Sequence, residues 1–277
     1  MTFDVAALLG LVQGVFMFVP VSSSSHLALT QHWLEGRGVP VPPPDSPEAI
    51  FVNLVLHVGT LVSIGIVMRA RLANLATGIV SELRTPAGQD RPAVRFALMI
   101  ILGTAVTGVL GLGIREIAPF ALGSPTVIAI MLVLTGVILW WTDKARPGTI
   151  ENPGAKAAIG VGIAQALALL PGLSRSGLTI AAGLALGMKR AQAAEFTFIL
   201  AIPTILAATL VQALDILAVR EPYQIPWGAL GVGFLVSAAS GTVALLLVLR
   251  LLYAARFRVF SLYVWALAAV VLALQVA

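Results

Sequence analysis

Two long apolar stretches of this chain are each broken at their centre by a proline and a run of polar residues, and this pattern restricts the fold most. The first break reads Pro20-Val-Ser-Ser-Ser-Ser-His26, and the second reads Pro171-Gly-Leu-Ser-Arg-Ser-Gly177. A bilayer resists an imidazole and a guanidinium, so such groups at membrane depth indicate a functional site. The question is what the two motifs could bind together.

The composition supports a helical integral membrane protein. Hydrophobic residues make up 59% of the 277 residues and charged residues 10%, whereas a soluble domain is about half apolar and about a quarter charged. The apolar runs are long and lack the alternation of barrel strands. The chain has no cysteine, which excludes disulfides and thiolate metal sites. The first residues, Met1 to Asp4, are not basic, so we expect no cleaved signal peptide.

Six stretches are predicted to span the membrane, because each approaches the roughly 20 apolar residues that a spanning helix needs. They are residues 49–68, 96–113, 120–141, 193–219, 228–252 and 258–277. The broken stretches 4–31 and 156–188 are too polar at their centres for plain spans. We interpret them as two re-entrant helical hairpins.

The distribution of basic residues predicts the orientation. Three loops hold most of them, namely Arg69, Arg71, Arg84, Arg91 and Arg95; Lys144, Arg146 and Lys156; and Arg250, Arg256 and Arg258. Loops between the other spans hold one each, Arg37, Arg115 and Arg220. Basic loops stay in the cytoplasm, so 156–188 must enter from the cytoplasmic side and 4–31 from outside. The net charge of +5 suits this orientation and predicts no nucleic-acid partner.

A weak internal repeat accompanies the two breaks. Gln13 precedes Pro20 much as Gln165 precedes Pro171, and an apolar span follows each break. We therefore predict one membrane domain of two inverted-topology repeats, about 1–142 and 155–277, whose broken helices meet near the midplane. The alternative is that both halves look alike only because both are rich in alanine and leucine.

The second motif has the chemistry of an anion site. Arg175 offers a planar fork that matches phosphate or carboxylate. Glycines allow tight turns, and a half-helix expected from Leu178 to Met188 directs N-terminal amides at an anion. The predicted binding residues of this motif are Ser174, Arg175, Ser176, Gly177 and Thr179. The alternative is a loop whose arginine reaches the surface or pairs with a carboxylate.

The first motif supplies His26 and four serine hydroxyls. A histidine can serve as nucleophile, general base or metal ligand, although a lone histidine is more often a packing residue. We predict His26 and Ser23 as catalytic residues with Arg175, and Ser22 and Ser24 as further binding residues. His57 lies within a predicted span, where we expect either a hydrogen bond to a neighbouring helix or a place near the site.

Glu195 is the one acid that we expect to reach the site from within a span. The alternative is a helix-terminal carboxylate that the helix dipole favours or that pairs with Lys189.

Over essentially its whole length the chain resembles the bacterial undecaprenyl-pyrophosphate phosphatase family, also called the bacitracin-resistance family. The most specific stretch is Gly162 to Ile180, close to that family's PGxSRSG signature, and Ala194 to Pro203 and Pro20 to His26 are also similar. The resemblance implies a bundle of inverted repeats with re-entrant helices in the bacterial inner membrane. It also implies removal of the terminal phosphate from a C55 isoprenyl pyrophosphate, which recycles the lipid carrier for cell-wall synthesis.

The resemblance further implies a pocket facing the periplasm or exterior, a calcium or magnesium ion, and site roles for His26, Ser23, Ser174, Arg175 and Ser176. We leave a homodimer open. Gln13 and Glu195 are the predicted metal ligands, because Met17 occupies the family's central acidic position. Positions 13 and 17 share one helix face, and a thioether is a poor ligand for a hard cation. Ser25 also replaces the family's glycine before the histidine.

Three functions follow from these patterns. The first is a polyprenyl pyrophosphate phosphatase, in which His26 attacks phosphorus or activates Ser23 and the Arg175 motif stabilises charge. The second is a polyprenyl-phosphate carrier or flippase that binds without hydrolysis. The third is a phosphatase for another lipid pyrophosphate. We favour the first, because His26 and the whole Ser-Arg-Ser cradle are retained.

Overall fold

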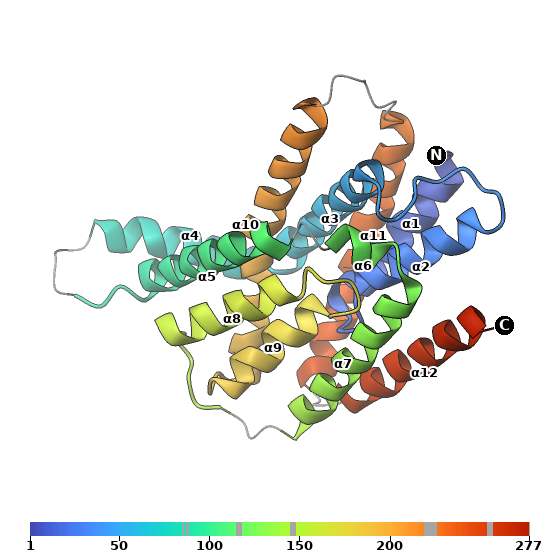
Figure 1. Cartoon of the computed structure of the whole chain (residues 1–277). Coiled ribbons are helices and arrows are strands. Elements are labelled where there is room, and N and C mark those ends of the chain that lie inside the picture. The colour runs from blue at the N-terminus through green and yellow to red at the C-terminus, as the bar shows by residue number, and fades with distance from the viewer. Residues whose placement is uncertain are drawn as a thin grey trace.

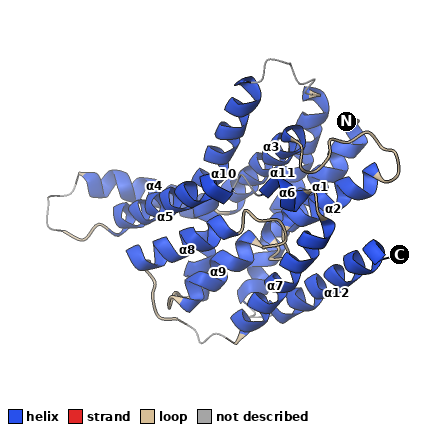
Figure 2. Ribbon diagram, in the orientation of Figure 1, coloured by secondary structure: helices blue, strands red, loops and turns tan. Residues whose placement is uncertain are grey.

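The chain folds almost entirely into helices (Figure 2). The computed structural model describes residues 1–84, 86, 89–114, 118–144, 148–218, 226–253 and 257–276. Within these ranges there is no sheet, and one isolated bridge pairs Ile150 with Met188. The helices are α1 (Phe3–Phe18), α2 (Ser23–Glu35), α3 (Pro47–Val67), α4 (Arg69–Leu83), α5 (Pro92–Ile114), α6 (Ala118–Leu122), α7 (Pro125–Asp143), α8 (Ala155–Leu167), α9 (Arg175–Ala185), α10 (Arg190–Ala218), α11 (Trp227–Tyr253) and α12 (Phe257–Val276).

Six helices in the described ranges are long and apolar enough to cross a membrane. They are α3, α5, α7, and the parts Arg190–Asp215 of α10, Trp227–Leu251 of α11 and Phe257–Gln275 of α12. Each coincides with one of the six predicted spans. The prediction of an all-helical, multi-pass membrane protein is therefore confirmed.

The two broken stretches fold as pairs of short helices. The first pair is α1 and α2, which are separated at residues 19–22, and the second is α8 and α9, which are separated at residues 168–174. The members of each pair contact each other. Both breaks contain the proline of their motif, because proline cannot donate an intrahelical hydrogen bond and clashes with the preceding turn.

Close helix packing holds the first break in the bundle. Helix α1 runs along α11, α8 runs along α5, and α7 lies beside α12 (Figure 1). A Cβ added to Gly14 of α1 would lie 2.6 Å from the carbonyl oxygen of Ser237 and 2.8 Å from the amide of Gly241. Small residues therefore let α1 and α11 approach closely, as is common in membrane bundles.

One helix was missed by the sequence analysis, which assigned the basic segment after the first predicted span to a loop. Residues Arg69–Leu83 of that segment form α4, which has no buried residue and lies against α5. The charged residues of this segment show where the membrane span α3 ends, but they are compatible with a further helix outside the span. Arg115, Arg146, Arg220 and Arg256, which also entered the charge count, lie outside the described residues.

Candidate active site

The second break is a capped helix start. Helix α9 begins at Arg175 and ends at Ala185, whereas Leu178 to Met188 was predicted. It begins early because the Ser174 hydroxyl accepts a hydrogen bond from the amide of Gly177 at 3.2 Å. The Ser176 hydroxyl lies 3.5 Å from that of Ser174. Thr179 instead donates to the carbonyl of Arg175 at 2.7 Å, so its proton is used within the helix.

A threonine of α7 fixes the loop of the second break. The Thr135 hydroxyl donates to the carbonyl of Gly172 at 2.7 Å and accepts from the amide of Ser174 at 3.0 Å. Gly172 has a φ of +99°, and a Cβ there would lie 2.2 Å from the Cβ of Met131. Only glycine fits this position without strain. The sequence analysis missed Thr135, because nothing local marks a threonine in an apolar span as a partner of a distant loop.

The first break turns at Ser22 and not at Ser25. Ser22 has a φ of 69°, a conformation that costs a non-glycine residue about 1–3 kcal/mol and is typical of functional sites. Its hydroxyl lies 2.8 Å from that of Ser25 and 3.3 Å from that of Ser24. Ser25 lies in the first turn of α2, so a serine there does not disturb the turn.

Ser22 also joins the two breaks. Its hydroxyl accepts a hydrogen bond from the amide of Gly172 at 3.3 Å, across 150 positions of sequence. The two motifs therefore meet inside the molecule, as the sequence analysis expected.

His26 is buried and held at both ring nitrogens. Nδ1 lies 2.7 Å from the carbonyl oxygen of Ser22, and Nε2 lies 2.9 Å from the hydroxyl of Tyr263 on α12. The ring of Phe16 stacks on the imidazole with a centroid distance of 3.9 Å. Ser23 begins α2, and in the described part of the chain no hydrogen bond joins its hydroxyl to the His26 ring.

Arg175 reaches from the second break to helix α1. Its Nη2 donates to the sulfur of Met17 at 2.6 Å. Gln13, one turn earlier, donates to the same sulfur at 3.4 Å, while its buried Oε1 has no hydrogen-bond partner. This places an arginine fork beside two neutral side chains in the interior, a position that favours an anion.

The donors in this part of the site do not fit a calcium or magnesium ion. Such ions take carboxylate and other oxygen ligands. Here the Arg175 guanidinium contacts the Met17 thioether, and the Gln13 amide oxygen is the one oxygen without a partner on this face. Glu195 contributes instead to an ion pair with Arg71 of α4 at 2.5 Å. Among the described residues there is no cluster of three or more acidic, histidine or cysteine side chains that could hold a metal.

His57 of α3 bonds the backbone of its own helix. Its Nδ1 lies 2.7 Å from the carbonyl oxygen of Asn53. Among the described residues its ring makes no hydrogen bond to a neighbouring helix, and a place near the site stays a prediction.

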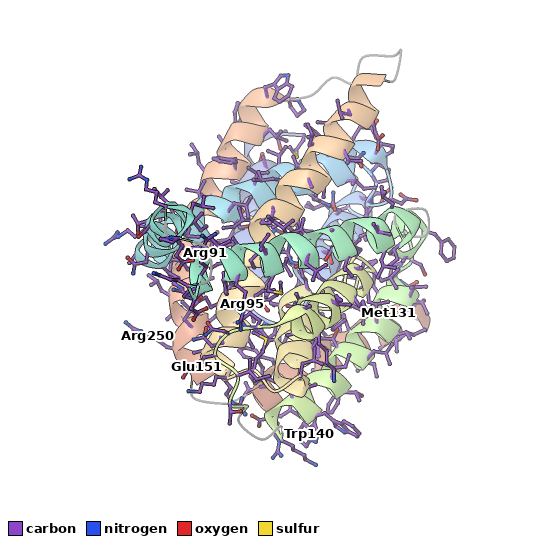
Figure 3. All side chains as sticks on the ribbon, turned by 90° about the vertical axis from the view of Figure 1, so that its left-hand side faces the viewer. Arg91, Arg95, Met131, Trp140, Glu151 and Arg250 are labelled. Carbon is purple, nitrogen blue, oxygen red and sulfur yellow. The ribbon has the colours of Figure 1, made fainter. Side chains whose placement is uncertain are left out.

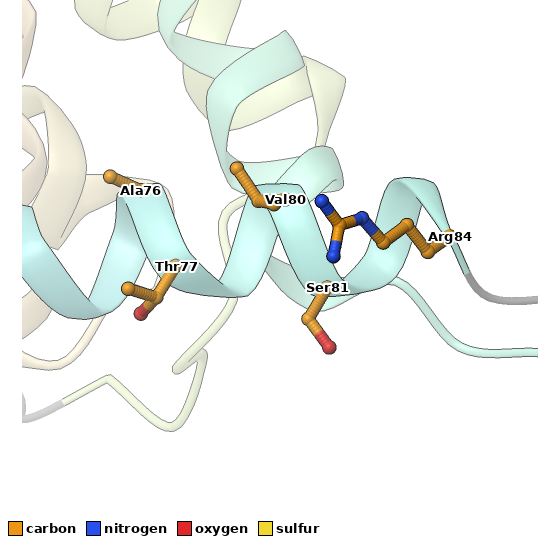
Figure 4. A pocket seen from close by; sticks show the side chains of 5 residues that line it. All are labelled: Ala76, Thr77, Val80, Ser81 and Arg84. Atoms are coloured by element: carbon orange, nitrogen blue, oxygen red, sulfur yellow. The ribbon is translucent and has the colours of Figure 1, made fainter.

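A shallow surface pocket lies away from these residues on the exposed helix α4 (Figure 4). Its lining residues come from this helix and from the residue that ends it: Ala76, Thr77, Val80, Ser81 and Arg84. No residue of either break contributes to it, so we do not assign it a role in the site.

The sequence matches a known family over nearly all of its length. A profile described as bacitracin resistance protein BacA matches residues 6–270. The chain is 46% identical to a protein named undecaprenyl-diphosphatase from Alkalilimnicola ehrlichii, over 95% of this chain and 93% of that protein. It is 45% identical to a protein of the same name from Halorhodospira halophila, over 97% and 96% of the two chains. A third of that name, from Desulfosudis oleivorans, is 37% identical over 95% of each chain.

Proposed function

This chain belongs to the family of the bacitracin resistance protein BacA, and on that premise we propose that it hydrolyses undecaprenyl pyrophosphate to undecaprenyl phosphate and inorganic phosphate. The observation that carries the proposal is the meeting of the two breaks, where the amide of Gly172 bonds the hydroxyl of Ser22. An anion cradle and a histidine then lie on two sides of one site. The name that the relatives share does not favour a non-hydrolytic carrier.

In this proposal the second break binds the pyrophosphate. Arg175 exchanges its weak contact with the Met17 sulfur for phosphate oxygens, which are far better acceptors for a guanidinium. The Ser174 and Ser176 hydroxyls and the amides at the start of α9 add donors. Binding residues are also expected at Ser22, Ser24, Gly177 and Thr179. Because the Thr179 hydroxyl donates within α9, we expect it to support the helix start more than the ligand.

His26 is the proposed nucleophile. A carbonyl oxygen can only accept, so Nδ1 carries the proton that bonds Ser22, and Nε2 of the neutral ring keeps its lone pair. Nε2 forms a bond to the terminal phosphorus while the bond to the bridging oxygen breaks, and the electron pair leaves on undecaprenyl phosphate. Water then attacks phosphorus, breaks the N–P bond and releases inorganic phosphate and a proton. Ser23 is the second candidate, but it lacks the hydrogen bond to His26 that activation would require.

A divalent cation stays a prediction, and the protein offers it few ligands. Gln13 supplies one amide oxygen, Met17 supplies none, and Glu195 is paired with Arg71. A cation that takes part would therefore have to be carried largely by the pyrophosphate oxygens. Arg175 supplies the positive charge that this chain itself brings to the site.

We also propose that the two halves are inverted repeats. Two matched helix contacts support this. A Cβ on Gly10 of α1 would lie 2.3 Å from the carbonyl oxygen of Gly233 in α11, and a Cβ on Gly162 of α8 would lie 2.8 Å from that of Gly103 in α5. One turn after each of these α1 and α8 glycines comes a buried glutamine with an unpaired Oε1, Gln13 and Gln165. On this proposal, α1–α2 and α8–α9 are the two re-entrant hairpins.

The proposed location is the bacterial inner membrane, with the site open to the periplasm. The number of basic residues in the predicted cytoplasmic loops supports it, and Figure 3 labels three of these arginines, Arg91, Arg95 and Arg250. Glu151 is exposed and accepts a hydrogen bond from Lys189, which lowers the pKa of its carboxyl. A homodimer also stays a prediction.

Phosphate release from undecaprenyl pyrophosphate by the purified protein in detergent tests the proposal. We expect release by the wild type and a loss of about 100-fold or more in His26→Ala and Arg175→Ala. The controls are His32→Ala and Arg37→Ala, because His32 bonds the carbonyl of Leu122 and Arg37 lies on Trp33. Release equal to a detergent blank at every calcium and magnesium concentration would overturn the proposal. Release from farnesyl but not undecaprenyl pyrophosphate would instead indicate another lipid substrate.

A further inference from the structure

We infer that Tyr263 of α12 is the positioning residue for His26, whose reactive nitrogen it caps until substrate displaces it. The inference rests on the proposed function, because it concerns the nitrogen that attacks phosphorus. It comes from a contact between residues 237 positions apart, in which the Tyr263 hydroxyl lies 2.9 Å from His26 Nε2.

The hydrogen-bond directions follow from the chemistry of the partners. Nδ1 donates to the Ser22 carbonyl, so the neutral ring has its only lone pair at Nε2. The Tyr263 hydroxyl must then be the donor to Nε2. The lone pair that would attack phosphorus is therefore occupied by a tyrosine proton in the free protein.

The surroundings of the ring leave Tyr263 as the part that can move. Phe16 covers one face of the imidazole, and Ser22 belongs to the strained turn that joins the two breaks. The Tyr263 ring lies nearly parallel to the imidazole, at an interplanar angle of 7° and a centroid distance of 5.7 Å. His26 is only 8% exposed, whereas Tyr263 is 42% exposed. A rotation of Tyr263 toward its open side would uncover Nε2 and leave the imidazole in place.

The cap has a distinct consequence for each part of the tyrosine side chain. The hydroxyl should shield Nε2 from electrophiles and should cost the enzyme one hydrogen bond when substrate arrives. The ring should keep the imidazole in the plane in which Nε2 faces the site. Removal of the hydroxyl alone should therefore raise the reactivity of His26, whereas removal of the ring should lower the turnover rate.

Carbethoxylation of the histidines by diethyl pyrocarbonate, followed by mass spectrometry, measures the cap without any substrate. One hydrogen bond is worth about 1 kcal/mol net, so His26 should react about fivefold faster in Tyr263→Phe than in the wild type. His32 and His57 serve as internal standards. The matched control is Leu262→Ala, an exposed neighbour on α12, and it should not change any rate.

Steady-state kinetics of the same variants complete the test. Tyr263→Phe should raise kcat/KM for undecaprenyl pyrophosphate by up to about fivefold, because substrate no longer displaces this hydrogen bond. Tyr263→Ala should lower kcat with little change in KM. An unchanged His26 reaction rate in Tyr263→Phe would overturn the inference, and so would an equal rise at all three histidines. A large loss of kcat in Tyr263→Phe would assign the hydroxyl to the substrate instead and would also overturn the cap. If faster labelling occurs in a protein that releases no phosphate, the proposed function fails while the cap stands.

Discussion

At the scale of single residues, the contact between Arg175 and Met17 has the largest chemical consequence. A guanidinium with a thioether as its partner is poorly compensated in the interior, so a phosphate oxygen gains more from it than from an arginine already paired with a carboxylate. The same contact sets a guanidinium and a thioether, which are no ligands for a hard cation, between α1 and α9. In the proposed function, Arg175 therefore supplies the positive charge where an acidic pair would hold a metal.

Met17→Glu tests that reading. The new carboxylate would share a helix face with the unpaired Oε1 of Gln13 and so add the oxygen donor that this face lacks. We expect calcium titration calorimetry to detect tighter binding to the lipid-free variant than to the lipid-free wild type. Leu11→Glu, at an exposed position of the same helix, is the control. Calcium binding to the lipid-free wild type that equals the variant's would contradict the reading.

Some residues of the site could be predicted from the sequence and others could not. His26, Ser22 and Arg175 lie in local motifs whose proline and serines interrupt apolar sequence, so they stand out. Thr135 and Tyr263 are ordinary residues of apolar helices, and their roles depend on contacts that only the folded bundle creates. Glu195 was expected at the site but pairs with Arg71. Arg71 lies on α4, and its sequence had been assigned to a loop because of its charges.

At the scale of elements, the packing of α1 on α11 decides where the face of Gln13 and Met17 lies. Gly14 is one point of close approach, since any side chain there meets the backbone of α11. The six spans were predictable because hydropathy and length suffice for a lipid-exposed helix. The interhelical contacts were not, because small residues allow close approach without specifying a partner.

Gly14→Ala should separate α1 from α11. The added Cβ would lie 2.0 Å from the Ser240 hydroxyl and 2.6 Å from the Ser237 carbonyl, and overpacking of this kind costs about 1–3 kcal/mol. We expect a lower thermal unfolding temperature and, because Met17 shifts relative to Arg175, slower phosphate release. Gly65→Ala on α3 is the control, since its Cβ would meet nothing within 4 Å. Equal unfolding temperatures for the two variants would show that α1 does not depend on this contact.

At the scale of the whole molecule, the proposed function requires a bundle with a cytoplasmic basic surface and a site that opens outward. The ion pairs Arg71–Glu195, Lys189–Glu151 and Arg258–Asp143 all involve residues of the predicted cytoplasmic ends. They agree with the count of basic residues, although exposed pairs of this kind contribute little stability.

Cysteine labelling tests the orientation in a chain that has no cysteine of its own. Gly36→Cys after α2 and Gln89→Cys between α4 and α5 are both exposed positions. In intact cells, a membrane-impermeant maleimide should label residue 36 and should label residue 89 only after lysis. The opposite pattern would reverse the orientation. The pair α1–α2 would then enter from the cytoplasm and the pair α8–α9 from outside.

The two breaks have separate roles in the proposed mechanism, and equilibrium binding of undecaprenyl pyrophosphate distinguishes these roles. His26→Ala should bind the lipid with an affinity within a few-fold of that of wild-type protein whose turnover is blocked. The substitution removes the attacking group and keeps the residues that bind the phosphate. Arg175→Ala should bind at least about 30-fold more weakly, since loss of one partner of a buried charged pair costs about 2–5 kcal/mol. An Arg175→Ala protein that binds as tightly as His26→Ala would contradict the claim that the second break holds the phosphate and the first break attacks it.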